Sequence, residues 1–315
     1  MNNSLDLSIE TGLLNSSIIS NDLDDQYYST LTAKWEDRSI CCCKIAYFPE
    51  GPFTIINHWR KNLTRPIIIV FIYILTLVVS IYDIIDTFPS SWFYDFALAL
   101  ISILFFNLLI SYLMIIFVGP GYVPYNWQVT RKKQYSWTEE MNSIAIYQEQ
   151  VQYARLSSRP PRASFSIEAR RFVLRADHFC LWTNSWIGFK NHRYFILFTF
   201  WAFLYCLGWL GSHYYWVLKA FHPYKIQNII SIVFCLPILY AIYFSFLHLF
   251  TSLRNLCHNI TITEKYKKFD VNRFNKGCFG NCEEVCGHRA CCLCWIFPFC
   301  PIPRVTDGFY SDYEL

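Results

Sequence analysis

Four long apolar segments alternate with polar segments along this chain of 315 residues. They run from about residue 66 to 85, 93 to 118, 194 to 217 and 229 to 250. A helix needs roughly 20 apolar residues to cross the hydrocarbon core of a bilayer, and each segment has that length. Buried core helices are the alternative, but four nearly uncharged segments of this length favour membrane spans. The pattern therefore predicts four transmembrane helices.

The basic residues predict how these spans are oriented. A basic collar precedes the first span, many Lys and Arg residues lie between spans two and three, and more follow span four. The links after spans one and three hold few of them. Cytoplasmic loops carry the excess of Lys and Arg in membrane proteins. Both chain ends and the long central segment are therefore expected to face the cytosol.

The predicted fold class is an α-helical polytopic membrane protein with a cytosolic catalytic module between transmembrane helices 2 and 3. Residues 1–40 are expected to be a disordered cytosolic N-terminus, because polar residues are frequent there and no apolar period persists. The remaining parts are a juxtamembrane segment at 41–65, helices 1 and 2 at 66–118, the module at 119–193, helices 3 and 4 at 194–250, and a cysteine-rich cytosolic tail at 251–315.

Composition supports a membrane protein. Hydrophobic residues make up 54% of the chain and charged residues 16%, whereas soluble domains carry about a quarter charged residues. The net charge of +4 is small, and no nucleic-acid partner is expected. The 14 cysteines are not spaced like a secreted disulfide framework. We expect most of them to be reduced, in the cytosol or in lipid.

The central segment holds many arginines and one compact group of chemical side chains. The arginine excess fits anionic lipid or a phosphate-bearing ligand, although the arginines can equally serve only to enforce topology. A carboxylate, an imidazole and a thiol follow closely at Asp177, His178 and Cys180. The thiolate is the nucleophilic form of cysteine. A histidine can take the thiol proton and an aspartate can orient the ring.

That short string alone is also compatible with a surface cysteine beside a satisfied histidine. The string lies just before the third apolar segment, and this position favours a reactive thiol. A thiol at the boundary of water and lipid can act on a molecule with one polar and one apolar end. Further motifs surround the string: Gly119-Pro120-Gly121, Arg159-Pro160-Pro161-Arg162, Trp182, Asn184, Gly188, Asn191, Thr261-Ile262-Thr263-Glu264, and a segment from Asn275 to Gly287.

In this order, on four spans, these motifs resemble the DHHC family of protein S-acyltransferases. The resemblance extends from about Pro66 to Gly287. The family usually has Asp-Pro-Gly after span two and Thr-Thr-x-Glu after span four, so this chain departs at Gly119 and Ile262. Leu181 also replaces the usual proline. The stretch from Phe117 to Pro124 further resembles the endoplasmic-reticulum branch, so endoplasmic reticulum or Golgi is the expected location.

The resemblance implies two structural zinc ions, but their ligand positions are changed. Those positions hold Gln152, Arg155, Phe165, Ser166, Ala169, Phe172, Phe179 and Trp186. None of these offers a thiolate or an imidazole, so we expect no zinc in this module and no other cofactor. Structural zinc contributes on the order of 10 kcal/mol to a small module. A buried aromatic contributes about 1.5–3 kcal/mol, and the hypothesis is that the four aromatic replacements fill the vacated volume as an apolar cluster.

The resemblance also implies a ping-pong reaction. Cys180 would attack the thioester of palmitoyl-CoA, with His178 as base and Asp177 as orienter. The acyl-enzyme would then pass its chain to a membrane-proximal cysteine of a protein substrate. A sixteen-carbon chain gains about 0.8 kcal/mol per buried methylene, so the site is expected to open into the bilayer-spanning helices.

Four aromatic residues are candidates for contact with the acyl chain. Trp182, Phe195 and Phe198 match family positions that line the acyl cavity. Ordinary helix packing is the alternative for Phe195 and Phe198, which are three residues apart. Tyr205, about two turns deeper, is a candidate for the cavity floor.

Two other functions compete with acyl transfer. A catalytically inactive relative would act as a membrane scaffold or adaptor and would not need its thiol. A channel or transporter would need polar residues that face one another inside the spans, and only Asp83, Asn107 and His248 are available.

The cysteines of the tail form a pattern of their own. Cys278, Cys282 and Cys286 have helical spacing and share one face. Metal binding is the less favoured reading, because most zinc sites have tighter Cys-x-x-Cys pairs. Acylation or burial near lipid is favoured, as for Cys41 to Cys43.

Overall fold

A computed structural model of the chain gives the arrangement of its elements. It describes residues 36–40, 43–47, 54–55, 64–87, 92–121, 159–166, 171–220, 226–268, 270, 274–300, 302, 304–306 and 308. The expectations for residues 1–35 and for Gln152, Arg155 and Ala169 lie outside these ranges.

Four long helices form the body of the protein. They are α2 (Thr64–Thr87), α3 (Trp92–Val118), α5 (His192–Ala220) and α6 (Ile226–Cys257). Each coincides with one predicted span, and all four are long and apolar enough to cross a membrane. The predicted α-helical polytopic architecture with four spans is confirmed, and the chain is a multi-pass membrane protein.

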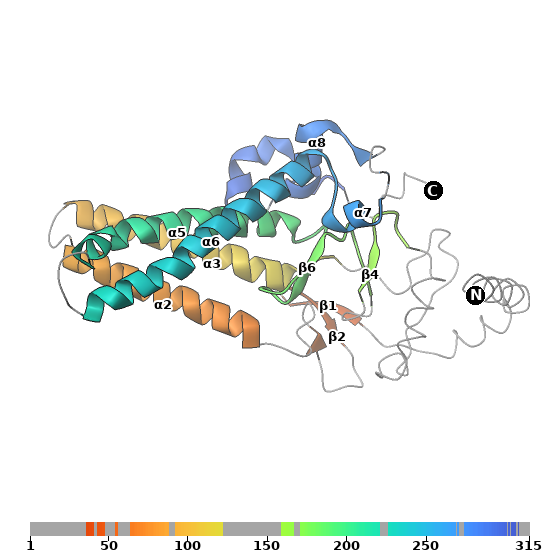
Figure 1. Cartoon of the computed structure of the whole chain (residues 1–315). Helices are drawn as coiled ribbons and strands as arrows, with labels where there is room; N and C mark the ends of the chain where they lie inside the picture. Colours follow the sequence, from red (N-terminus) through yellow and green to blue (C-terminus); the bar gives the residue numbers. More distant parts are fainter. Residues whose placement is uncertain are drawn as a thin grey trace, which may run out of the picture.

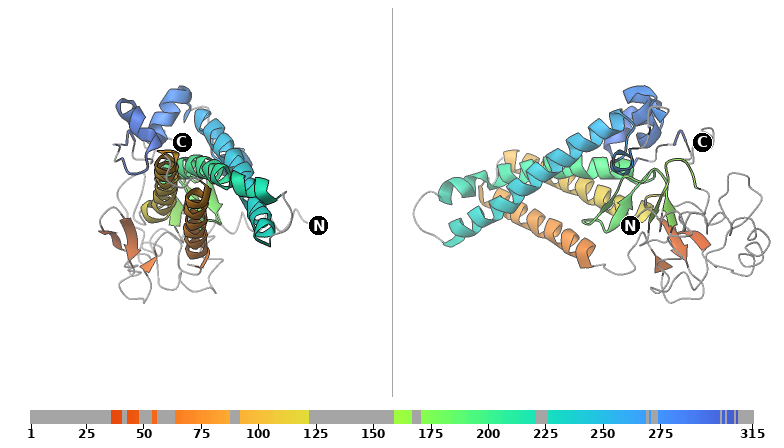
Figure 2. Two further views of the ribbon diagram at one scale, coloured as in Figure 1. Left: turned by 90° about the vertical axis from the view of Figure 1, so that its left-hand side faces the viewer. Right: turned by 45° about the vertical axis from the view of Figure 1, so that its right-hand side comes forward.

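Helix α5 is the centre of the bundle, because it packs against α2, α3 and α6 (Figures 1 and 2). The bundle core includes Trp209 and Tyr205 of α5 and Leu108 of α3. The outer faces of α2 and α6 carry exposed apolar side chains such as Phe71 and Tyr243. In a bilayer these faces meet lipid.

Polar contacts join α2 to α5 inside the bundle. The buried carboxylate of Asp83 pairs with Nδ1 of His213, and the hydroxyls of Ser80 and Ser212 are 2.7 Å apart. A carboxylate within a membrane span is tolerated when it faces the bundle interior and has a partner. Asn107 donates to the carbonyl of Ile103 in its own helix. These local partners give the channel reading no support.

The remaining described elements gather at one end of the bundle (Figure 1). Two antiparallel hairpins pair β4 (Ser164–Ser166) with β5 (Arg171–Val173) and β6 (His178–Cys180) with β7 (Ser185–Ile187). After α6 follow the short helix α7 (Ile262–Tyr266), α8 (Gly277–Cys286) and the 3-10 helix η4 (Arg289–Ile296). The central module and the tail therefore share one end of the molecule.

A separate, three-stranded antiparallel sheet precedes α2. It consists of β1 (Glu36–Ile40), β2 (Cys43–Tyr47) and β3 (Thr54–Ile55). Strand β1 lies at the boundary predicted between the disordered N-terminus and the juxtamembrane segment.

The aromatic residues at the family's zinc positions form two cross-strand pairs. The rings of Phe165 and Phe172 meet edge to face at 5.3 Å across β4 and β5, and those of Phe179 and Trp186 at 6.1 Å across β6 and β7. Such pairs add about 0.5–1.5 kcal/mol beyond burial of area. Nε1 of Trp186 donates to Oγ of Ser166 at 2.9 Å, which links the two hairpins. These five positions offer zinc no thiolate or imidazole and do not fit a structural ion.

We predict that the two hairpins depend on these rings and not on a metal. Phe172 is 3% exposed, and Phe172→Ala should destabilise the module by about 3–5 kcal/mol because it leaves a cavity. Hydrogen exchange of β4–β7 in the detergent-solubilised protein measures this. A strong chelator should leave that exchange unchanged. Phe279→Ala, at an 84% exposed position, is the matched control, and chelator-induced exchange in β4–β7 would contradict the prediction.

Candidate functional site

Strand β6 presents the imidazole and the thiol on one face. Side chains alternate along a strand, so His178 and Cys180 share a face while Phe179 points the other way, toward Trp186. Cys180 is 5% exposed and packs in an apolar cluster with Ile187 and with Phe195 of α5. The thiol therefore lies where the module meets the membrane helices.

His178 connects the carboxylate to the thiol. Its Nδ1 is 2.7 Å from Oδ2 of Asp177, and its ring is close enough to Cys180 to lower the pKa of the thiol. Because Nδ1 is engaged by the carboxylate, Nε2 is the nitrogen left for the thiol. The ring of Phe195 contacts the imidazole edge to face, with centroids 5.0 Å apart. The structure thus brings together the three predicted catalytic groups.

Asp177 is fixed by a turn that lies about 85 residues later in the chain. The backbone N–H of Ile262 donates to Oδ1 of Asp177 at 2.8 Å. The hydroxyl of Thr263 donates to the Asp177 carbonyl at 2.6 Å, and the N–H of Thr263 does so at 3.1 Å. Ile262 stands where the family usually has threonine, but its contribution comes from the main chain, so this departure leaves the contact intact.

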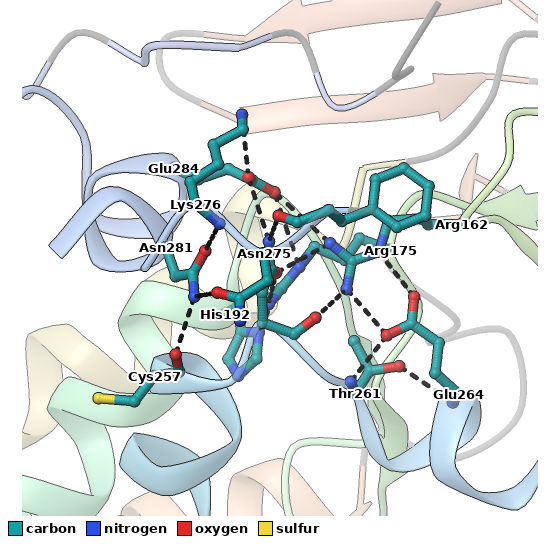
Figure 3. Close-up of polar contacts among 12 residues, drawn as sticks. Arg162, Arg175, His192, Cys257, Thr261, Glu264, Asn275, Lys276, Asn281 and Glu284 are labelled. Carbon is teal, nitrogen blue, oxygen red and sulfur yellow. Dashed lines mark hydrogen bonds and ion pairs between the residues drawn. The ribbon is translucent and has the colours of Figure 1, made fainter. Parts of the chain in front are cut away.

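The turn that holds Asp177 is itself locked by a buried ion pair (Figure 3). Thr261 and Glu264 form a reciprocal capping box at the start of α7. The Glu264 carboxylate accepts hydrogen bonds from Nε and Nη2 of Arg162 at 2.6 and 2.8 Å. Nη1 of Arg162 also donates to Oδ1 of Asn259 at 2.8 Å. Removing one partner of such a pair costs about 3–5 kcal/mol, because the other charge stays buried.

A second buried arginine ties the module to α5 and α8. Nη1 of Arg175 is 2.7 Å from Nδ1 of His192, and Nη2 donates to Oδ1 of Asn259 at 3.0 Å. The Glu284 carboxylate lies 3.6 Å from Arg162 and 3.9 Å from Arg175. Arginines that the sequence offered as ligands for phosphate or lipid are thus engaged inside the protein.

The two flanking motifs dock the module against the end of α3. The N–H groups of Leu174 and Lys190 donate to the carbonyls of Gly121 and Pro120 at 2.8 and 3.0 Å. Nδ2 of Asn191 donates to the carbonyl of Ile115 at 3.1 Å. These bonds set the distance between β6 and the membrane helices.

Aromatic side chains continue from the thiol into the bundle. The ring of Phe198 is 5.5 Å from that of Tyr112 and 6.5 Å from that of Tyr73. Deeper still, the hydroxyl of Tyr205 is 3.0 Å from that of Thr76 on α2. Phe195, Phe198 and Tyr205 therefore follow one line along α5.

Trp182 lies apart from that line, at an open apolar pocket of about 430 Å³. The pocket is bounded by the first turns of α2 and by the β6–β7 turn, and its lining residues are Arg65, Ile68, Ile69, Ile72, Leu181 and Trp182. The carbonyl of Trp182 accepts a hydrogen bond from the hydroxyl of Tyr112 at 2.9 Å. Two of its lining residues, Leu181 and Trp182, directly follow Cys180 in the sequence.

A family model described as DHHC palmitoyltransferase matches residues 145–269, which include the three catalytic candidates and the turn that holds Asp177. Residues 145–269 are therefore similar to the DHHC palmitoyltransferase domain. "Palmitoyltransferase ZDHHC3" of Rattus norvegicus is 28% identical over 223 residues, which cover 65% of this chain and 71% of that protein.

Other curated relatives match over shorter stretches. "Probable protein S-acyltransferase 14" of Arabidopsis thaliana is 31% identical over 118 residues, or 34% of this chain and 38% of that protein. "Palmitoyltransferase ZDHHC8" of Mus musculus is 30% identical over 135 residues, or 40% of this chain and 17% of that protein. This chain therefore spans less than half the length of these two relatives.

The environment of this site shifts the pKa of all three groups. Burial alone would raise the pKa of Asp177, but the hydrogen bond and charge of His178 and the N–H of Ile262 hold it well below its usual range. Burial lowers the pKa of His178, and its hydrogen bonds to Asp177 and Cys180 outweigh that and raise it to about 9. Burial raises the pKa of Cys180, and the contact with His178 brings it below its ordinary value.

The structure adds one residue to the site that the sequence analysis did not assign to it. His248 of α6 lies between Phe195 and Phe244, with ring centroids 6.2 and 4.1 Å away. In the sequence it is a lone histidine in an apolar segment, and nothing there indicates that α6 turns it toward the module. Phe244 in turn contacts Trp182 at 6.0 Å, so this aromatic row connects the pocket with the imidazole of His178.

We predict that Cys180 reacts as a thiolate at lower pH than a free cysteine. The raised pKa of His178 keeps the imidazolium charged up to about pH 9, and this charge stabilises the thiolate as the pH rises. Alkylation of Cys180, followed by peptide mass spectrometry across a pH series, should level off at lower pH in the wild type than in His178→Ala. Asp177→Asn should slow alkylation at neutral pH about tenfold, the equivalent of one pKa unit.

The matched control is Asp95→Asn, an exposed carboxyl at the other end of α3. An alkylation profile that is the same in the wild type, His178→Ala and Asp177→Asn would show that the three groups do not act together.

Proposed function

We propose that this chain is a protein S-acyltransferase that moves a palmitoyl group from acyl-CoA to protein cysteines through an acyl-enzyme on Cys180. The observation that supports this most is the buried thiol of Cys180 on the same strand face as His178, whose ring Asp177 orients, where the module meets the membrane helices. The likeness to named palmitoyltransferases over 65% of the chain supports the same reaction.

The first half-reaction loads the enzyme. The Cys180 thiolate attacks the thioester carbonyl of acyl-CoA, the new carbon–sulfur bond forms and the bond to the CoA sulfur breaks. The CoA thiolate leaves and takes the proton that His178 carries. Asp177 stays ionised throughout, because the N–H of Ile262 and the imidazolium both stabilise its charge.

The second half-reaction unloads it. His178, now neutral, accepts the proton of the incoming protein thiol. The resulting thiolate attacks the acyl carbon on Cys180, and the Cys180 thiolate leaves beside the imidazolium. The resting thiolate–imidazolium pair is restored, so no proton or electron is consumed over the full cycle.

The acyl chain is placed by the hydrophobic effect. Each methylene that leaves water stabilises the complex by about 0.8 kcal/mol. The line of Phe195, Phe198 and Tyr205 along α5 gives the chain an apolar route from Cys180 into the bundle. The CoA head stays on the module side, where Arg65 at the open pocket is available to meet a phosphate.

The orientation and partners form part of the same proposal. Both termini, the module at 119–193 and the tail at 251–315 face the cytosol, which the gathering of β4–β7 with α7 and α8 at one end of the bundle supports. The endoplasmic reticulum or Golgi is the proposed location. Its partners are palmitoyl-CoA, the bilayer and protein substrates with membrane-proximal cysteines.

The deciding experiment is thioester labelling with an alkyne analogue of palmitoyl-CoA. The purified wild type should form an adduct on the Cys180 peptide that hydroxylamine removes and an acceptor thiol discharges. Cys180→Ser should lower this signal at least about 10³-fold, as loss of a catalytic nucleophile does. Cys292→Ser, at an exposed tail cysteine, is the control. A scaffold would show no adduct on Cys180 and would keep its cellular function in Cys180→Ser.

We also predict that Tyr205 limits the length of the acyl chain. Tyr205→Ala removes the ring and its hydrogen bond to Thr76, and this deepens the apolar space between α5 and α2. The space then holds two further methylenes of the acyl chain, and each stabilises the complex by about 0.8 kcal/mol. The preference for an eighteen-carbon over a sixteen-carbon chain should therefore rise about tenfold. Tyr214→Ala, on the same helix but 60% exposed, is the control. Competition between the two acyl-CoAs measures the ratio, and no change in it would exclude Tyr205 as the floor.

A further inference from the structure

Three thiols from two separate elements converge beside the module. Cys257 is the last residue of α6, and Cys278 and Cys282 lie in the first two turns of α8. Their Sγ atoms all lie within 4.8 Å of one another. In the described part of the chain, no other group of three or more His, Cys, Asp or Glu ligand atoms converges in this way.

Contacts that do not involve sulfur hold the two elements together. Asn281 sits between the two cysteines of α8, and its Nδ2 donates to the carbonyl of Cys257 at 2.8 Å and to Oδ1 of Asn275 at 2.8 Å (Figure 3). Nδ2 of Asn259 donates to the carbonyl of Phe274 at 2.7 Å. The end of α6 and the start of α8 are therefore fixed side by side by their polar groups, and the sulfurs are carried to one point as a result.

The donor set indicates the class of ligand. Thiolates are soft donors that select zinc and copper(I) among biological metals. A zinc–sulfur bond of about 2.3 Å in tetrahedral geometry places neighbouring sulfurs roughly 3.8 Å apart, and three thiols within 4.8 Å of one another fit that arrangement. The first turn of α8 holds no acidic residue, and a helix N-terminus favours negative charge on Cys278.

A disulfide is the alternative to a metal site for these thiols. In the structure, Cys257 and Cys278 form one. That bond uses two of the three sulfurs and leaves the thiol of Cys282 next to it. Disulfides are rare in the reducing cytosol, which is the side proposed here for the tail. Under those conditions all three thiols are free to ligate.

We propose that Cys257, Cys278 and Cys282 form a three-thiolate site for a zinc-class ion, with the fourth position open to water or another ligand. Cys286, which helical spacing groups with Cys278 and Cys282, lies outside this cluster, and Cys257 takes its place. The ion ties the last membrane helix to α8, whose Glu284 contacts both buried arginines of the module. The site does not depend on the acyl-transfer reaction.

Metal content of the full-length, detergent-purified protein under reducing conditions tests the proposal. The wild type should carry one zinc per chain by mass spectrometry. Cys257→Ser, Cys278→Ser and Cys282→Ser should each weaken zinc affinity by more than the roughly 10–100-fold that even outer-shell changes cause. Cobalt should give a thiolate charge-transfer band that each of these variants lacks. Cys292→Ser, in η4, should retain both the zinc and the band.

A second measurement needs no variant. In chelated wild type, added Zn²⁺ should protect these three cysteines from alkylation and leave Cys292 reactive, and it should slow hydrogen exchange in α8. The proposal is overturned if Zn²⁺ protects none of them, or if rapid acid trapping from cells finds Cys257 and Cys278 oxidised or the group acylated. Labelling of Cys180 is scored separately, so failure of the metal site and failure of acyl transfer are told apart.

Discussion

The rest of the site depends on the hydrogen bonds that Ile262 and Thr263 donate to Asp177. A histidine that activates a thiol must be held in one tautomer and one orientation, and Asp177 does this through Nδ1 of His178. Asp177 lies in a short connection before a three-residue strand, which alone holds little in place. The turn after the last membrane helix holds Asp177 in place. The buried ion pair between Arg162 and Glu264 stabilises that turn. The tail is thus a structural part of the site.

The same network explains how the module keeps its form with aromatic residues at the positions where the family has metal ligands. Each hairpin has one edge-to-face aromatic pair, and Trp186 and Ser166 connect the two. These local contacts are modest in energy. The larger part comes from docking, since buried Arg162 and Arg175 bind Asn259 and the motifs around Pro120 and Asn191 attach the module to α3. The module is therefore stabilised by the membrane helices and tail that surround it.

Much of this could be predicted from the sequence wherever the signal is local. The four spans follow from uninterrupted apolar length, and the order of Asp177, His178 and Cys180 is enough to suggest their chemistry. What could not be predicted rests on pairs far apart in the chain. Nothing near Arg162 indicates Glu264, and nothing near Asp83 indicates His213. Ile262 departs from the family's usual threonine in its side chain, whereas the contact with Asp177 is made by its backbone N–H. Cys257 lacks helical spacing to Cys278, so only the fold brings them together.

The contact between Asp83 and His213 bears on how the protein enters the membrane. Helices α2 and α3 leave the ribosome well before α5, so the carboxylate of Asp83 first meets the bilayer without its imidazole. Asp83 lies about one turn before the end of α2, so inserting it unpartnered costs less than the about 2.5–3.5 kcal/mol of a carboxylate at the membrane centre. The hairpin of α2 and α3 is then an insertion intermediate, because Asp83 gains its partner His213 only when α5 inserts. Nascent chains that stop before residue 213 would expose this charge to the surveillance machinery that removes misassembled membrane proteins.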